Sequence, residues 1–247
     1  MTSPIPSEPR TQPELYHAPI AAALWITVGG ILMIYVVQLA LLPVIGVSAA
    51  LLAYAAAAAA MVLAARTGGF SLGVRRPGGR FVLAAVLIGI SCWYLETEVV
   101  VALQRYLPGD TKQLERAVVE TPLALSLIVL ALAPAISEEL VFRGVLTRSL
   151  AARRGWLGVV VSALVFSLYH LEPPHMLGVL PLGLALGVLA VRSGSIVPGM
   201  IAHFLNNAIV LLLSRVTVVD SHPQLTLIAA CLLFAGGLVL AHVGAAA

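Results

Sequence analysis

The sequence predicts an all-α membrane protein, a polytopic bundle of about eight transmembrane helices that encloses a polar intramembrane cavity. The first observation is composition: of 247 residues, 60% are hydrophobic and only 10% are charged, and the mean hydropathy is +1.03. A soluble domain carries roughly 25% charged residues, so this chain has too few to cover a surface exposed to water. The second is that its apolar residues gather in runs near the ~20 residues that a helix needs to cross a bilayer. The third is a set of polar residues inside those runs.

Residues 1–18 are polar and rich in proline, and they do not resemble a signal peptide, so we expect a disordered tail. Residues 19–247 are expected to form one integral membrane domain. The first two apolar runs are separated only near Pro43, and the fifth and sixth are short, which favours helices shielded by protein. The predicted spans cover residues 19–42, 44–65, 81–104, 122–149, 156–171, 175–192, 196–214 and 223–244.

The basic residues predict the orientation of the spans. Clusters of arginine follow the second, fourth and sixth spans, whereas the other loops carry balanced or sparse charge. By the positive-inside rule the even-numbered loops and both termini are then cytoplasmic. The scarcity of lysine and the abundance of Ala, Leu and Val suggest a bacterial host rich in G and C, and therefore its cytoplasmic (inner) membrane. Since the arginines serve topology, the net charge of +3 does not indicate a nucleic-acid partner.

Three spans carry polar residues that a bilayer disfavours. A charge inside a membrane span costs about 2.5–3.5 kcal/mol on insertion scales, so each one requires an explanation. The fourth span contains Glu138, Glu139 and Arg143, the fifth contains Phe166 and His170, and the seventh contains His203 and Asn207. Such a combination on three separate helices indicates a common site rather than isolated buried polar residues.

Helical geometry assigns partners to these residues. Glu139 and Arg143 are four residues apart and can form an ion pair on one face, as a structural brace. Glu138 is rotated by about 100° from Glu139, so both carboxylates cannot address the same arginine. The partner of His170 is expected to come from another helix. On the predicted spans Glu138 lies toward the cytoplasmic side and His170 toward the outer side. For the two to meet, the limits of the spans must shift, or the fifth helix must be sunk or tilted.

The chemistry that these groups favour is hydrolysis. A carboxylate such as Glu138 in an apolar site can serve as general base, with His170 holding the same water. His203 and Asn207 can stabilise a developing oxyanion. A zinc set of Glu138, His170 and His203 is a competing interpretation, but the sequence has no HExxH motif, and we favour water activation without a cofactor.

The motifs EExxxR (Glu138, Glu139, Arg143), FxxxH (Phe166, His170) and HxxxN (His203, Asn207) resemble those of the CPBP family of intramembrane proteases. This family includes the CAAX prenyl endopeptidases and bacteriocin-processing and Abi-type members. The similarity covers about residues 122–214. It implies an eight-helix fold and protease activity, with Glu138 and His170 activating water, His203 and Asn207 forming the oxyanion hole, and Glu139, Arg143 and Phe166 supporting the site.

The expected substrate is a membrane-associated or membrane-spanning protein or peptide, such as a bacterial prepeptide or a C-terminal sorting tag. Two alternatives remain open: a non-catalytic immunity or peptide-binding protein, and a proton-coupled transporter that uses the buried carboxylates. The sequence also leaves open whether Glu96 and Glu98, in the third span, lie at the membrane interface or line the cavity.

Overall fold

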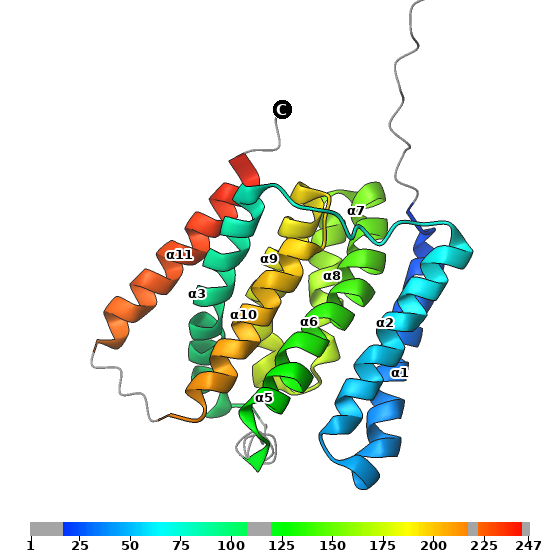
Figure 1. The fold of residues 1–247 in the computed structure, drawn as a ribbon. Helices are drawn as coiled ribbons and strands as arrows, with labels where there is room; N and C mark the ends of the chain where they lie inside the picture. The colour runs from blue at the N-terminus through cyan, green and yellow to red at the C-terminus, as the bar shows by residue number, and fades with distance from the viewer. Residues whose placement is uncertain (1–16, 108–119, 217–221, 244–247) are drawn as a thin grey trace, which may run out of the picture.

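The computed structural model describes residues 17–107, 120–216 and 222–243. Within these ranges the chain forms eight helices and no strand, which confirms the predicted all-α bundle (Figure 1). Residues 1–16 of the predicted disordered tail lie outside the described ranges. The helices that precede and follow the fourth span are α1 (Ile20–Ile45), α2 (Ser48–Gly68), α3 (Gly79–Gln104), α8 (Trp156–Tyr169), α9 (Pro173–Ser193), α10 (Val197–Leu213) and α11 (Pro223–Val243).

The fourth span is one continuous helix of changing type, from Leu123 to Arg154. It consists of α5 (Leu123–Ser126), the π-helix η1 (Leu127–Leu132), α6 (Ala133–Glu138), the π-helix η2 (Glu139–Thr147) and α7 (Arg148–Arg154). π-helical turns are rare and occur frequently at functional sites. Here the change from α6 to η2 falls between Glu138 and Glu139, so the two carboxylates lie where the helix type switches.

Six helices of the described chain are long and apolar enough to cross a membrane, and α8 and α10 are shorter apolar helices. Burial separates a centre from a periphery. In their most apolar stretches, the fourth span and α9 bury 61% and 56% of their residues, whereas α1 and α11 bury 11% and 17%. The sixth span, α9, was expected to be short and to be shielded from lipid by protein. It has 21 residues and lies at the centre, because it packs against α3, α8, α10 and α11.

The periphery carries an apolar surface of the kind expected against lipid. Trp25 and Leu39 on α1 expose 76% and 71% of their surface, and Leu232 on α11 exposes 69%. So large an apolar surface is rare on a soluble monomer and is expected of a helix in contact with lipid. Figure 1 shows α11 at one side of the bundle and α1 with α2 at the other, so these helices flank the buried centre.

A tight turn at Gly155 joins α7 to α8. Gly155 has a φ of 55°, a left-handed conformation that glycine adopts without steric cost. One turn later, a Cβ on Gly158 would collide with the backbone of Leu150 and Ala151, so only glycine permits this close approach. The hydroxyl groups of Thr147 and Ser162 then meet at 2.6 Å, eight residues before and seven after the turn. The two helices therefore run back along each other in a fixed register.

Candidate active site

The two adjacent carboxylates of the fourth span point to different partners. Glu139 forms a 3.0 Å ion pair with Arg143, and both side chains are buried. Glu138, also buried, accepts a hydrogen bond of 3.2 Å from the hydroxyl group of Tyr169 at the end of α8. Its other oxygen, Oε2, is buried and accepts no hydrogen bond from the described residues. Glu138 therefore keeps one oxygen without a hydrogen bond from the described residues. Glu139 is paired with a cation through Oε1, and its Oε2 likewise accepts no hydrogen bond from them.

The imidazole ring of His203 lies between these carboxylates. Its Nε2 atom is 3.8 Å from Glu138 Oε2, and its Nδ1 atom is 3.4 Å from Glu139 Oε1. One turn earlier on α10, a Cβ added to Gly199 would collide with the Glu139 carboxylate, so glycine at this position lets α10 approach the fourth span. The approach of α10 thus brings the third motif against the first.

Phe166 connects the three motifs through its ring. The guanidinium carbon of Arg143 lies 4.1 Å from the ring centroid, a cation–π contact, and Arg143 also donates to the carbonyl oxygen of Gly183 at 3.1 Å. The edge-to-face partners of the Phe166 ring include His203 and His170, at centroid distances of 5.9 and 5.0 Å. The phenyl ring therefore separates the arginine from the two histidines while touching all three.

Glu138 and His170 lie at similar distances along the chain from the turn at Gly155. Glu138 lies 17 residues before Gly155 and His170 lies 15 residues after it. The two positions are therefore separated from the turn by similar lengths of helix. The fifth helix, α8, has only 14 residues and ends at Tyr169, directly before His170.

His170 finds its partner on another helix, as expected. Its ring stacks on that of His175 with a centroid distance of 4.8 Å and an interplanar angle of 18°, and its Nδ1 atom lies 3.0 Å from the carbonyl oxygen of Phe166. His175 lies in the first turn of α9. Among the described contacts, none joins His170 directly to Glu138.

Asn207 has a partner on the fourth span. Its Nδ2 atom donates to the carbonyl oxygen of Leu130 at 3.4 Å. Pro134, four residues after Leu130, has no backbone N–H and cannot supply the usual α-helical hydrogen bond to that carbonyl. The side-chain oxygen of Asn207 accepts from Asn206 at 3.4 Å. Asn207 therefore lies against the irregular part of the fourth span, one turn along α10 from His203.

Two tyrosines near the site escaped the sequence analysis, which had also left the positions of Glu96 and Glu98 open. Tyr54 lies beside Glu138 and Tyr169, and the hydroxyl group of Tyr35 donates to the carbonyl oxygen of Tyr169. The one signal for Tyr54 was a large polar side chain inside an alanine run. Glu96 is buried and bonded to His175 and Asn206, whereas Glu98 is exposed.

The loop between α2 and α3 holds the start of α10. The backbone N–H of Ile196 donates to the carbonyl oxygen of Gly73 at 2.9 Å, and Ser195 Oγ donates to that of Arg75 at 2.6 Å. Arg148 Nη1, from the fourth span, donates to the carbonyl oxygen of Gly194 at 3.1 Å. These contacts fix the end of α10 that carries Gly199 and His203 into the site.

Comparison with protein families agrees with this geometry. Residues 120–209 match the model of the type II CAAX prenyl endopeptidase family, Rce1-like. This segment of the chain is Rce1-like. The match confirms the resemblance drawn from the three motifs, and all seven motif residues lie inside it. The Rce1-like family is a family of proteases.

The Rce1-like segment covers less than half of the chain, and α1, α2 and α3 lie outside it. Tyr35, Tyr54 and Glu96 therefore reach the site from helices that the family match does not include. No curated protein and no solved structure matches the chain.

The alternative zinc set does not come together as a metal site in the described part of the chain. There, no three side chains of His, Cys, Asp or Glu are grouped so that they could hold a metal ion. His170 faces His175 and the backbone of Phe166 rather than Glu138 and His203. Among the described contacts, none joins His170 to Glu138 or His203, so the zinc set stays an alternative prediction.

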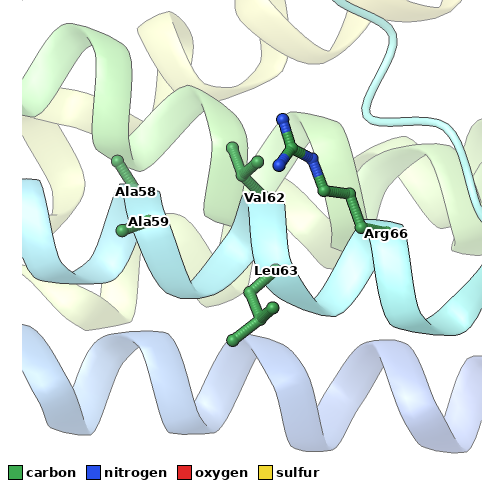
Figure 2. A pocket seen from close by; sticks show the side chains of 5 residues that line it. All are labelled: Ala58, Ala59, Val62, Leu63 and Arg66. Atoms are coloured by element: carbon green, nitrogen blue, oxygen red, sulfur yellow. The ribbon is translucent and has the colours of Figure 1, made fainter.

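The motif residues are closely packed, and a nearby hollow has a different lining. A groove of about 340 Å³ runs along α2 and is lined by Ala58, Ala59, Val62, Leu63 and Arg66 (Figure 2). None of the motif residues lines it. A water-filled cavity bounded by the fourth, fifth and seventh spans remains a prediction.

Proposed function

We propose that the chain is an intramembrane endopeptidase of the glutamate type, which hydrolyses a peptide bond in a membrane-associated or membrane-spanning substrate. The observation that carries this proposal is the uncommitted Oε2 atom of Glu138. It is buried, lies 3.8 Å from His203 Nε2 and belongs to a carboxylate whose other oxygen is held by Tyr169. A fixed carboxylate with one free oxygen suits a general base.

In the proposed reaction Glu138 Oε2 takes a proton from a water molecule as the water oxygen attacks the carbonyl carbon of the scissile bond. The carbonyl electron pair moves onto its oxygen, and His203 and Asn207 donate hydrogen bonds to that oxyanion. When the tetrahedral intermediate collapses, the C–N bond breaks and the proton on Glu138 passes to the leaving amine. His170 orients the water from the side of α8.

Two features of the described contacts support these roles. Asn207 Nδ2 donates to Leu130 at 3.4 Å, a long hydrogen bond that a substrate carbonyl could replace. Glu139 is paired with Arg143 and so braces the fourth span. It also fixes His203 by its contact with the Nδ1 atom of the imidazole ring. The two neighbouring carboxylates thus have different roles because their surroundings differ.

We further propose a bacterial prepeptide or a C-terminal sorting tag as the substrate, and the inner membrane of a bacterium as the location. A short hydrophobic tag offers the apolar surface that a site between membrane helices can accept. We also propose that both termini are cytoplasmic, as the arginine clusters indicate. A fluorescent protein fused after Ala247 should then fluoresce, whereas a periplasmic phosphatase fused there should be inactive; the reverse pattern would contradict this orientation.

The deciding experiment compares the terminal peptides of membrane proteins in cells that carry the wild type, Glu138→Ala or Glu98→Ala at matched expression. Glu98 is an exposed carboxylate on α3 and provides the control. A defined set of proteins should keep an intact terminal segment in Glu138→Ala but not in the other two strains. If the wild type and Glu138→Ala have identical termini while deletion has a phenotype, the protease proposal fails and peptide binding or proton-coupled transport must be tested.

A further inference from the structure

Glu96 lies in α3, outside the Rce1-like segment, and has no part in the reaction described above. A carboxylate inside a membrane span is costly unless it is paired, and such residues are functional far more often than those at the surface. Glu96 is buried, whereas Glu98, two residues further along the same helix, is exposed. The difference indicates that Glu96 has a specific task within the bundle.

Both oxygens of Glu96 are engaged, and each leads toward a residue of the proposed mechanism. Oε1 lies 3.2 Å from Nε2 of His175, the residue on which His170 stacks. Oε2 accepts a hydrogen bond of 3.2 Å from Nδ2 of Asn206, whose amide also contacts the side chain of Asn207. One carboxylate therefore connects α9 and α10 and touches the nearest polar neighbours of His170 and Asn207.

The packing of α3 against α9 brings this carboxylate close. A Cβ on Gly178, in α9, would lie 2.8 Å from a methyl group of Val100 and 3.2 Å from Cγ of Glu96. Glycine at position 178 thus permits an approach that a larger residue would prevent. The contact holds the first turn of α9, and with it His175, against α3.

We propose that Glu96 is a positioning residue for the proposed protease: by holding His175 and Asn206, it fixes His170 and Asn207 relative to each other. This inference rests on the proposed function, since the two positioned groups belong to the proposed mechanism. His170 comes from α8 and Asn207 from α10, and the described contacts include no direct bond between them. The bridge through Glu96 supplies the missing connection, and a displacement of about 1 Å in a reacting group can cost 100-fold in rate.

The first arm of the test measures substrate cleavage from the terminal peptides of membrane proteins. It compares strains that carry Glu96→Ala, Glu96→Gln, Glu98→Ala or Glu138→Ala. Glu96→Ala should lower cleavage by about tenfold or more, because His170 and Asn207 are no longer fixed. Glu96→Gln should recover a substantial part of it, since the amide can accept from Asn206 and donate to His175. Glu98→Ala should match the wild type.

The second arm does not depend on any substrate. Purified protein in detergent is treated with diethyl pyrocarbonate, and mass spectrometry follows the modification of each histidine. In Glu96→Ala, His175 and His170 should be modified about fivefold faster than in the wild type, the change expected from the loss of one hydrogen bond. His242, at the far end of α11, serves as the internal reference.

The outcomes separate this inference from the proposed function. If Glu138→Ala abolishes cleavage while Glu96→Ala retains it, the positioning role is wrong and the protease proposal stands. Equal loss in Glu96→Gln and Glu96→Ala would also overturn positioning by hydrogen bonds. If Glu138→Ala retains cleavage, both proposals fail, whatever the histidine modification shows. Should Glu96→Ala not accumulate, Glu96→Gln and His175→Ala provide the same comparison.

Discussion

The strongest test of the site's construction is the replacement of Arg143 by methionine. Arg143 is fully buried and makes three contacts: the 3.0 Å ion pair with Glu139, the 3.1 Å hydrogen bond to Gly183 and the cation–π contact with Phe166. Methionine keeps much of the length of the side chain but removes the charge. Among the described residues, Glu139 is then left buried with His203 Nδ1, at 3.4 Å, as its one remaining ion-pair partner.

The expected loss of unfolding free energy is about 3 kcal/mol, at the lower end of the 3–5 kcal/mol observed when one partner of a buried ion pair is removed. An ordinary hydrogen bond within a membrane averages only about 0.6 kcal/mol. The measured loss therefore distinguishes a buried ion pair between Arg143 and Glu139 from an ordinary hydrogen bond. The double variant Glu139→Gln/Arg143→Met removes both charges, and it should be more stable than Arg143→Met by about 1.5 kcal/mol or more.

The assay is unfolding in mixed micelles of increasing denaturing detergent, followed by tryptophan fluorescence. Arg66→Met, at the exposed end of α2, provides the control and should change stability by less than about 0.5 kcal/mol. A loss below about 1 kcal/mol in Arg143→Met would refute the account of a buried charge pair. A double variant no more stable than the single one would refute it equally.

Three further predictions concern the candidate active site. Tyr169→Phe removes the hydrogen bond to Glu138 Oε1, so the general base is no longer fixed. Cleavage, measured from the terminal peptides of membrane proteins, should fall about tenfold. Unchanged cleavage would contradict this. Gly199→Ala places a Cβ against the Glu139 carboxylate and should lower the unfolding free energy in the detergent assay by about 1–3 kcal/mol. The control Gly29→Ala, in open space on α1, should change it little. Equal effects of the two variants would be inconsistent with the close approach of α10. Treatment of the purified protein with a strong zinc chelator should leave cleavage within about twofold of its initial rate, and loss that zinc restores would instead favour the metalloprotease alternative.

The membrane architecture was predictable because it depends on simple periodic features. Long apolar runs and the turn residues between them place all eight helices within a few residues, and the helices α3 and α11 begin and end close to the predicted limits. The burial of α9 agrees with its expected shielding by protein, although the helix extends beyond the predicted limits of 175–192 at both ends. The Glu139–Arg143 ion pair was also predictable, because its spacing lies within a single helix.

Contacts between helices were harder to predict, and the reason differs from one residue to another. The common depth of Glu138 and His170 could have been counted from Gly155, since the two positions lie at similar distances on either side of that turn. The assignment of Glu138 and His170 to opposite sides of the membrane hid this relation, because it rested on the approximate limits of the spans and not on a count from the turn. Tyr35 and Tyr54 could not be counted in this way: no chain turn relates α1 or α2 to the fourth span, so only their packing brings the tyrosines to the site.

Glu96 presents the opposite case, because its cost in a membrane was evident from the sequence while its partners were not. An unpaired carboxylate near the end of a span can reach the headgroup region, and that reading suited both Glu96 and Glu98. The two differ only in the helix face that they occupy. Glu96 lies on the face that meets Gly178 and Asn206, whereas Glu98 is exposed. A close approach of two helix backbones supplies the partners that a lone carboxylate needs. Where a span contains two acidic residues on different faces, the one that faces a glycine on a neighbouring helix is therefore the better candidate for a buried role.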